Sequence, residues 1–415
     1  MHSLFHRFLR RTHFWRSIGF VELSELYAAR VLRTLAMGMI GGFVAIFLYQ
    51  EGYSLLFIGV YFILYFLVRA LASIPSAFFV ARFGPKHGTM VSNILFIPSM
   101  ISLTTTPIFG LWSLGIFLVL NSFSRTLYEI CHLVNFSKVK HIEHAGKEIG
   151  IMQIVDRMTT ALSPLLGGLI AFAFGPQVMI IIAAVILSLA AGPLFYTSEP
   201  VKTHQKIFLR GLSIKKIWRN IIASIAVGVD SNISGFQWYL FIFVVIIGAS
   251  GGNEAYAQIG ALGSVALLSG LATAHIFGRV IDKRRGGDLL RYSVIGTAIL
   301  HFIRPFIQSP AGVAVMNITN EVSTTGYTMP YLKGLFAAAD DLPGYRIVYV
   351  SIIAAAVCIG DTIAVTTFTA LVFLMGDIEG FKSTYLVLAP VTLLIAFHGF
   401  AIYKERSFLA NLVRA

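Results

Sequence analysis

The chain has 415 residues, of which 57% are hydrophobic and 12% are charged, and its formal net charge is +13. This composition excludes an ordinary soluble enzyme, because too few polar residues remain to cover the surface of a water-soluble domain. The Lys and Arg residues gather in alternate loops and near the chain ends, which indicates membrane topology rather than nucleic-acid binding. The composition predicts an all-α protein embedded in a lipid bilayer.

The first 24 residues carry four arginines among apolar residues and lack the continuous apolar core and cleavage site of a signal peptide. They predict a cytoplasmic segment that forms a helix at the membrane interface. A helix needs about 20 mostly apolar residues to span a bilayer. Twelve such runs follow, and they lie at 27–50, 54–81, 89–107, 110–136, 149–174, 177–197, 220–247, 255–281, 289–308, 310–335, 346–374 and 381–403.

The polar, basic segment 198–219 divides these runs into two sets of six. We therefore predict an N-terminal bundle at 25–197, a cytoplasmic linker at 198–219, a C-terminal bundle at 220–404 and a cytoplasmic tail at 405–415. The loops predicted to be cytoplasmic contain Arg82, Lys86, Lys138, Lys140, Lys147, Lys202, Lys206, Arg210, Lys215, Lys216, Arg219, Lys283, Arg284, Arg285, Lys404, Arg406 and Arg414. Outer loops hold a single Lys or Arg, at Lys382. The positive-inside rule then places both termini in the cytoplasm, and the short loops favour a bacterial-type plasma membrane.

Two short basic turns, 77–88 (AFFVARFGPKHG) and 278–287 (GRVIDKRRGG), each lie between apolar runs. An Ile-Gly pair precedes each turn at nearly the same distance, at Ile58-Gly59 and at Ile259-Gly260. One half of the chain is therefore interpreted as a diverged copy of the other, as in many secondary transporters.

Both turns resemble the pattern Gly-x-x-x-Asp-Arg-x-Gly-x-Arg, which follows the second helix in the major facilitator superfamily. Arg82, Gly84 and Lys86 match it in the first turn, where Ala77 and Ala81 replace the usual glycine and aspartate. The matching residues of the second turn are Gly278, Asp282 and Lys283. The resemblance implies twelve transmembrane helices in two pseudo-symmetric six-helix bundles, with both turns acting as a gate. Alternatively, the basic residues are only cytoplasmic anchors.

Polar residues inside the spans are costly and therefore informative. The fourth span carries a one-sided stripe of Asn121, Arg125, Tyr128, Glu129 and His132, and the tenth repeats it with Asn317, Asn320, Glu321, Thr324, Tyr327 and Tyr331. The seventh span adds Asp230, Ser234, Gln237 and Trp238. The resemblance implies that these spans line a central cavity. The alternative is that the polar residues only hold helices together.

Depth along each span separates the charged residues. Arg69, Arg125, Asp230, Glu321 and Asp361 fall near the middle, whereas Arg279, Arg304 and Lys333 lie near an end and can extend to the interface. We predict that substrate binding or coupling involves Arg125, Glu129, Asp230, Gln237, Trp238, Asn317, Glu321 and Asp361. Arginine before glutamate is the weaker order for a pair along one helix, so other partners are open for Arg125 and Glu129. For Arg69, a structural ion pair and a ligand contact both remain open.

The fifth span contains Gly150, Pro164, Gly167 and Gly168, which resemble the antiporter signature of the family. Thr159 and Ser163 stand where that signature has glycine. The resemblance implies an exporter that exchanges substrate for protons. Tight helix packing explains the same residues without a direction of transport.

These patterns predict a secondary transporter that moves a small organic solute by alternating access, with protons as the coupling ion and Glu321, Asp230 or Glu129 as the proton carrier. We expect a monomer, which suffices for this architecture, and no cofactor. No metal site or disulfide framework is suggested, since Cys131 and Cys358 both lie inside apolar runs. The alternatives are a membrane-embedded enzyme and a non-transporting receptor or scaffold. The G-x-S-x-G sequence at 248–252 lies in a predicted outer loop rather than at a strand-to-helix elbow, which argues against a nucleophilic serine.

Overall fold

The computed structural model describes residues 20–139, 146–192, 207, 212, 214–248, 252–283, 285–342 and 344–403. Side chains are described within these ranges except at 20–27, 135–139 and 146–154. All regular structure in this part of the chain is helical, which confirms the predicted all-α class. The tail at 405–415 lies outside the described residues, as do most of the N-terminal segment and most of the linker.

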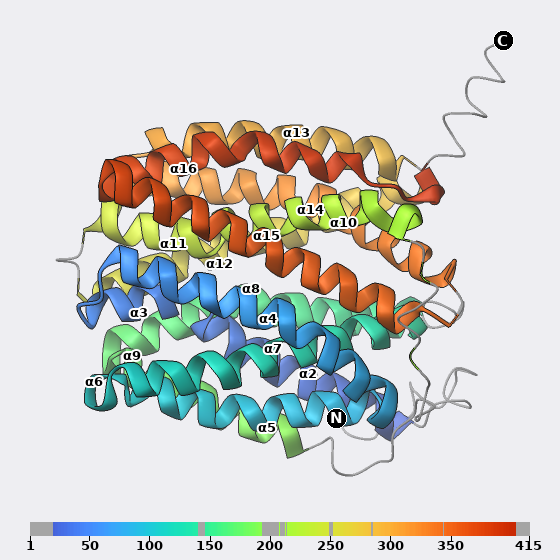
Figure 1. Cartoon of the computed structure of the whole chain (residues 1–415), viewed down its shortest axis with the longest axis horizontal. Coiled ribbons are helices and arrows are strands. Elements are labelled where there is room, and N and C mark those ends of the chain that lie inside the picture. The colour runs from blue at the N-terminus through green and yellow to red at the C-terminus, as the bar shows by residue number, and fades with distance from the viewer. Residues whose placement is uncertain are drawn as a thin grey trace.

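Residues 20–192 are called the N-terminal half and residues 214–403 the C-terminal half. The N-terminal half consists of α2 (Phe20–Ile40), α3 (Val44–Gln50), α4 (Leu55–Phe83), α5 (Pro85–Thr104), α6 (Thr106–Phe109), α7 (Leu111–Val139), α8 (Gly146–Phe174) and α9 (Pro176–Ala191). The C-terminal half consists of α10 (Ile214–Ser234), α11 (Phe236–Phe241), the π-helix η3 (Ile242–Ile247), α12 (Glu254–Asp282), α13 (Gly286–Ile303), the 3-10 helix η5 (Arg304–Phe306), α14 (Pro310–Asp340), α15 (Arg346–Met375), α16 (Asp377–Thr392) and the 3-10 helix η6 (Leu393–Phe397). The two halves occupy the lower and upper parts of Figure 1.

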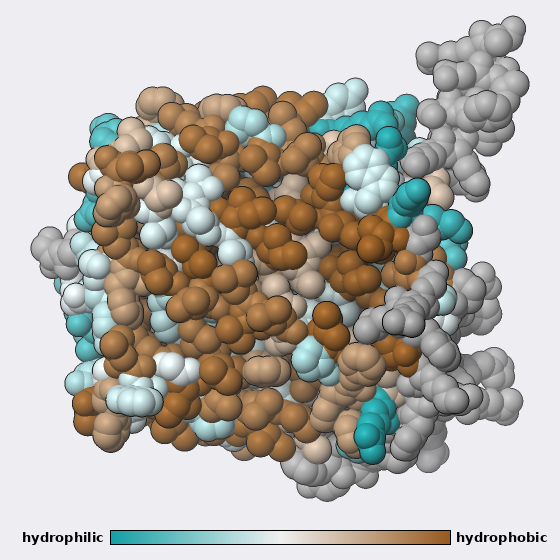
Figure 2. Space-filling model, viewed as in Figure 1, coloured by the Kyte–Doolittle hydropathy of each residue, from teal (hydrophilic) through white to brown (hydrophobic). Residues whose placement is uncertain are grey.

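Seven helical stretches of the described chain are long and apolar enough to cross a membrane. They are Ala28–Gln50, Leu55–Phe83, Val155–Phe174, Ile214–Ile247, Glu254–Asp282, Arg346–Met375 and Asp377–Phe397. Apolar side chains cover the middle of the face in Figure 2, and hydrophilic residues gather at its two ends. The protein is therefore a multi-pass membrane protein, and the full set of twelve spans stays a prediction.

The first helix of each half is interrupted, although the sequence predicted continuous spans at 27–50 and 220–247. Residues 41–43 separate α2 from α3, and Gly235 separates α10 from α11. Glycine weakens a helix because it loses the most backbone freedom on folding. Gly42 also permits a close approach, since a Cβ atom at this position would lie 3.1 Å from Cδ2 of Tyr239 on α11. The two interruptions thus bring the first helices of the two halves together.

The seam between the halves is formed by two long helix pairs. α4 packs along α15, and α8 packs along α12 (Figure 1). A Cβ atom at Gly59 would lie 3.1 Å from Cβ of Thr369, and one at Gly260 would lie 3.1 Å from the carbonyl carbon of Pro164. Both glycines of the repeated Ile-Gly pair therefore stand at contacts between the halves.

Replacing Gly260 with alanine is expected to destabilise the protein by about 1–3 kcal/mol, because the added methyl group meets the backbone of α8, which cannot rotate away. Gly278 lies on the same helix, and a Cβ atom there meets nothing within 4 Å. Gly278→Ala is the matched control and should be neutral or stabilising, since alanine favours a helix over glycine by about 0.8–1.0 kcal/mol. Thermal unfolding of the purified variants measures the difference, and equal effects at both positions would refute this account of the seam.

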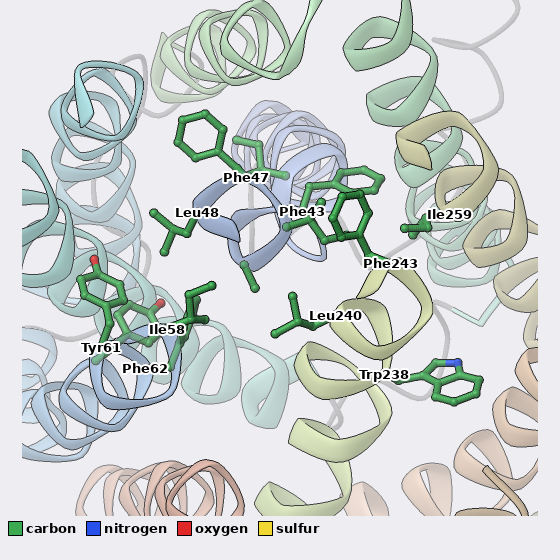
Figure 3. Close-up of a cluster of buried hydrophobic side chains, with 14 of the residues drawn as sticks. Phe43, Phe47, Leu48, Ile58, Tyr61, Phe62, Trp238, Leu240, Phe243 and Ile259 are labelled. Carbon is green, nitrogen blue, oxygen red and sulfur yellow. The ribbon is translucent and has the colours of Figure 1, made fainter. Parts of the chain in front are cut away.

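Apolar clusters hold the seam on both sides of its middle. The larger cluster brings Phe43, Phe47 and Leu48 against Leu240 and Phe243 (Figure 3). Beside it, Tyr256 donates to Oε1 of Gln50 at 2.7 Å, and Nε2 of Gln50 donates to the carbonyl of Gly252 at 3.2 Å. A smaller cluster joins α4 and α7 to Ala354 of α15. Its members are Val80, Leu127, Ile130, Cys131, Val134 and Ala354.

Candidate functional site

A cavity of about 230 Å³ lies between the halves. Its walls come from α2, α3, α4, α5 and α7 on one side and from α10, α11 and α15 on the other, and the interrupted segments at 41–42 and 235 also line it. Most of the wall is apolar and includes Met37, Phe62, Phe66, Phe96, Met100, Phe117 and Phe236. The polar part includes Tyr65, Arg69, Asn121, Arg125, Ser231, Asn232 and Asp361. Ionisable side chains are thus concentrated in a cavity whose walls are otherwise mostly apolar.

Arg69 and Glu129 form an ion pair that joins α4 to α7. Nη2 of Arg69 lies 2.8 Å from Oε2 of Glu129, and Arg69 is only 9% exposed. The sequence left the partner of each residue open, and the structure shows that they bind each other. Nε of Arg69 has no hydrogen-bond partner among the described residues. This Nε is itself buried, so the cavity meets Arg69 through the rest of its side chain.

Asp361 ends a chain of hydrogen bonds that crosses from α11 to α15. Gln237 donates to Oδ1 of Asn232 at 2.9 Å and to the carbonyl of Ala364 at 3.1 Å. Asn232 in turn donates to Oδ1 of Asp361 at 3.4 Å, a long bond. Two predicted residues, Gln237 and Asp361, are brought together in this way. Asp361 reaches the cavity, and Gln237 supports it from behind.

Arg125 lines the cavity and makes no hydrogen bond or ion pair with any residue that the structure describes. Its guanidinium reaches toward the interruption of the first helix, since a Cβ atom at Gly41 would lie 3.9 Å from Nη2. A nearby residue on the same helix, Asn121, accepts a hydrogen bond from Tyr65 at 2.8 Å. An arginine without a partner is costly at membrane depth, so the Arg125 guanidinium requires water or a ligand in the cavity.

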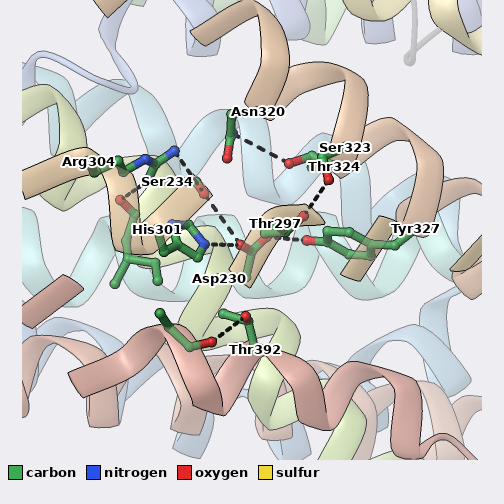
Figure 4. Close-up of polar contacts among 12 residues, drawn as sticks. Asp230, Ser234, Thr297, His301, Arg304, Asn320, Ser323, Thr324, Tyr327 and Thr392 are labelled. Atoms are coloured by element: carbon green, nitrogen blue, oxygen red, sulfur yellow. Dashed lines mark hydrogen bonds and ion pairs between the residues drawn. The ribbon is translucent and has the colours of Figure 1, made fainter. Parts of the chain in front are cut away.

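Asp230, also predicted for the site, is not among the cavity-lining residues. It lies inside the C-terminal half with 1% of its surface exposed. Nε2 of His301 lies 2.7 Å from its Oδ1, and Tyr327 and Ser234 donate to the same carboxylate (Figure 4). Three side chains, one each from α10, α13 and α14, therefore meet at one buried acid. This network fastens three helices to one another.

Arg304 was expected to extend to the membrane surface, and that expectation is wrong. The residue is 0% exposed, because α13 ends at Ile303 and the chain turns inward through η5. Nη1 of Arg304 donates to the carbonyl of Ile233 at 2.7 Å, and the guanidinium lies 4.8 Å from the ring centroid of Trp238. Depth along the chain did not reveal this turn.

The predicted residues Trp238 and Asn317 meet each other rather than the cavity. Nε1 of Trp238 donates to Oδ1 of Asn317 at 2.6 Å, which ties α11 to α14. Glu321 packs against α12, where a Cβ atom at Gly270 would lie 2.7 Å from Cγ of Glu321. Trp238 and Asn317 thus make a contact within the C-terminal half, whereas Glu321 also interacts electrostatically with Arg157 of α8 in the N-terminal half.

The two turns predicted as gates differ in their surroundings. Gly84 has φ +89° and ends α4, a backbone shape that favours glycine. Lys86 is buried, whereas Arg82, Asp282 and Lys283 are exposed. Within the described chain, Asp282 and Lys283 form no ion pair, and Gly278 has open space where a side chain would be. Their gating role stays a prediction.

The residues of the fifth-span signature lie on α8, where Gly150 falls in the part with backbone alone described. A Cβ atom at Gly167 would lie 2.8 Å from Cα of Met39, and one at Gly168 would lie 3.2 Å from Cα of Ala257. Pro164 faces Gly260 of α12. These small residues let α8 pack closely against α2 and α12, so the packing interpretation accounts for them.

One buried cluster near α2 was missed by the sequence analysis. Arg30 binds Asp156 through two hydrogen bonds of 3.0 and 2.8 Å, and the guanidinium of Arg33 lies 3.8 Å from the ring centroid of Tyr128. The available signal was the pair of arginines three residues apart at the start of the first apolar run. It was hidden because such residues also serve as interfacial anchors.

The sequence profile described as Major Facilitator Superfamily matches residues 26–365. Among solved structures, the nucleoside transporter NupG is similar with a TM-score of 0.65 and 11% identity, over 91% of this chain and 98% of that one. A POT family transporter in complex with a thioalcohol-conjugated peptide is similar with a TM-score of 0.66 and 13% identity, over 90% of this chain and 95% of that one. At such identities the likeness concerns the fold. No curated protein sequence matches this chain. The chain belongs to the Major Facilitator Superfamily.

Proposed function

We propose that this secondary transporter moves a small organic solute by alternating access between two six-helix bundles, with twelve spans in total. The observation that carries the proposal is the cavity between the halves, because residues of both halves line it and its charged groups lie inside apolar helices. A crevice of this kind at the interface of internal repeats is where secondary transporters bind their substrates.

The seam supplies parts suited to such a motion. Glycines at α4–α15 and α8–α12 permit smooth sliding contacts, and separate apolar clusters hold the seam on the two sides of the cavity. Opening one cluster while the other stays packed would expose the cavity to one side of the membrane at a time. The positive-inside pattern supports a plasma-membrane orientation with both termini in the cytoplasm.

The transport proposal is tested in proteoliposomes with a defined set of labelled solutes. Because the neighbouring structures are a nucleoside transporter and a peptide transporter, the set contains nucleosides and dipeptides beside monosaccharides and monocarboxylates. Saturable uptake of at least one class, absent from protein-free liposomes, is the expected result. Hydrolysis of a solute without its movement would instead favour a membrane enzyme, and binding without movement would favour a receptor.

Proton coupling through Asp361 is the second part of the proposal. Asp230 accepts hydrogen bonds from several side chains, and Glu129 is paired with Arg69. Asp361 has one long hydrogen bond and faces the cavity. Glu321, the third predicted carrier, packs against α12 and, like Asp230 and Glu129, is not among the cavity-lining residues. Asp361 is therefore the acid best placed to exchange a proton with cavity water. Only the α8 signature supports the assignment as an exporter, and helix packing accounts for the same residues. The charges in the cavity are therefore the better guide to the direction of transport.

Asp361→Asn is therefore expected to abolish accumulation driven by a pH gradient while leaving solute exchange across the membrane intact. Asparagine mimics the protonated acid and keeps a partner for Asn232, so the carrier loses only its titratable group. Uptake with a pH gradient and counterflow without one separate the two activities. The exposed Asp377, replaced by Asn, serves as the control. Gradient-driven accumulation by Asp361→Asn would exclude this residue as the proton carrier.

A further inference from the structure

The charged residues around the cavity are not all paired with one another. Arg69 is neutralised by Glu129 across the wall of the N-terminal half. Asp361 stands on the C-terminal half and is held there by Asn232. Arg125 stands on the N-terminal half without a partner in the described chain. One cation is thus left over on one wall, and one weakly held acid faces it from the other half.

An unpaired guanidinium selects the charge of its ligand. It presents a planar set of donors that matches a carboxylate or a similar oxyanion, and it carries no acceptor for a cationic group. In an apolar chamber this preference is strengthened, because both partners are shielded from water. Arg69 lines the same wall and adds a second positive charge, which Glu129 offsets. A cationic solute would instead meet two guanidinium groups.

The apolar part of the cavity wall determines which kind of non-ionic group the ligand can carry. Phe62, Phe66 and Phe236 meet Met37 and Met100 around the charged patch. Aromatic and thioether surfaces favour an apolar or aromatic body over a sugar-like one, since a hydroxyl-rich solute would leave its polar groups without partners. The volume of about 230 Å³ lies below the about 300–1,000 Å³ typical of sites for drug-sized ligands. The chamber suits a solute smaller than a drug molecule.

Resting on the proposed transport function, we propose that the substrate is a small organic monoanion whose oxyanion binds Arg125 and whose apolar body packs against the Phe and Met wall. Asp361 interacts electrostatically with Arg69, Glu129 and Arg125 of the other half. Its protonation removes a negative charge that competes with the anion for these two guanidinium groups. Anion and proton then favour each other in the cavity and cross the membrane in the same direction. The α8 signature alone would have indicated exchange in opposite directions.

Matched acid and amide probes test the charge preference on the full-length purified protein. The pairs are benzoate with benzamide, phenylacetate with phenylacetamide, and 4-methylpentanoate with 4-methylpentanamide, and benzylammonium is the cationic probe. Each is titrated while thermal unfolding is recorded. At least one carboxylate is expected to raise the unfolding temperature in a saturable manner, more strongly than its amide and more strongly than benzylammonium.

Variants connect this preference to the cavity. Arg125→Gln should weaken carboxylate binding by about 10- to 100-fold, the effect expected for one hydrogen-bonded charge, and Arg125→Lys should restore part of it because the charge remains. Arg279→Gln, at an exposed arginine of α12, should bind like the wild type. If every carboxylate behaves like its amide, or if Arg125→Gln binds as the wild type does, the proposal is wrong.

The outcomes also separate this proposal from the transport function. Carboxylate binding that depends on Arg125, in a protein that moves no labelled solute, would leave the anion site standing and overturn the transport function. Saturable uptake of a neutral or cationic solute, with no carboxylate preference at Arg125, would do the reverse. Carboxylate uptake that an inward proton gradient drives in the wild type but not in Asp361→Asn would support both.

Discussion

Asp230→Ala is expected to lower the free energy of unfolding by about 3–5 kcal/mol, as other broken buried ion networks do. The acid is 1% exposed and accepts hydrogen bonds from His301 and Tyr327, both themselves buried. Removing it leaves those donors inside the C-terminal half without an acceptor, and the desolvation cost of each then falls on the folded state alone. Equilibrium unfolding in detergent micelles or nanodiscs measures the loss.

Asp341→Asn is the matched control for that substitution. Asp341 is an exposed acid at the end of α14 and makes no ion pair within the described chain, so its replacement should change stability by less than about 0.5 kcal/mol. Asp230→Asn should fall between the two, because the amide keeps one acceptor for a donor of the network. A loss at Asp230 no larger than at Asp341 would show that the network does not hold α10, α13 and α14 together.

The second large effect is expected at the ion pair between α4 and α7. Glu129→Leu removes the ion-paired counter-charge of the Arg69 guanidinium, which is 9% exposed, and Arg69→Met leaves the acid unpaired. The stability losses of the two single variants should add up to more than the loss of the double variant, because the double variant leaves neither charge buried without its partner. The expected coupling energy is about 0.5–3 kcal/mol, with the lower part of that range favoured by the partial exposure of the Glu129 side chain.

A double-mutant cycle measures this coupling directly, with unfolding followed for the wild type, both single variants and Arg69→Met/Glu129→Leu. The pair Lys382 and Glu379 supplies the control, because its two side chains are more exposed and lie on one helix. Its coupling should not exceed about 0.5 kcal/mol. Additive losses at Arg69 and Glu129 would mean that their contact contributes nothing to the fold.

Much of the fold follows from apolar run length. The run predicted at 346–374 corresponds to α15 (Arg346–Met375), and the run at 54–81 corresponds to α4 (Leu55–Phe83). The interruptions at 41–43 and at Gly235 were not predicted, because a glycine inside an apolar run is compatible with an unbroken transmembrane helix. The first interruption lies at a contact between the halves, where Gly42 meets Tyr239, and no single-sequence pattern reports such a contact.

The candidate site was predictable in part for a related reason. Polarity at mid-depth pointed to Arg125 and Asp361, and both line the cavity. The same criterion pointed to Asp230, which faces the interior of the C-terminal half. Depth measures position along a helix axis, whereas the direction of a side chain depends on rotation about that axis and on the neighbouring helices. For the same reason, the sequence did not decide whether Arg69 pairs with Glu129.

Other parts of the sequence analysis remain predictions for physical reasons. Asp282 and Lys283 are exposed and form no ion pair within the described chain, so only a second conformation could show whether they act as a gate. The sequence G-x-S-x-G includes residues 249–251, which lie outside the described residues. Whether this sequence has a catalytic role depends on measured activity rather than on the fold.

Uptake through a filled cavity tests the central claim most directly. Ser231 lines the cavity with an exposed side chain, so Ser231→Trp places an indole in the space proposed for the substrate. Val185→Trp puts the same group on an exposed apolar position of α9 as the control. The account predicts saturable uptake by the wild type and by Val185→Trp, and none by a correctly folded Ser231→Trp. Undiminished uptake by Ser231→Trp would contradict transport through this cavity.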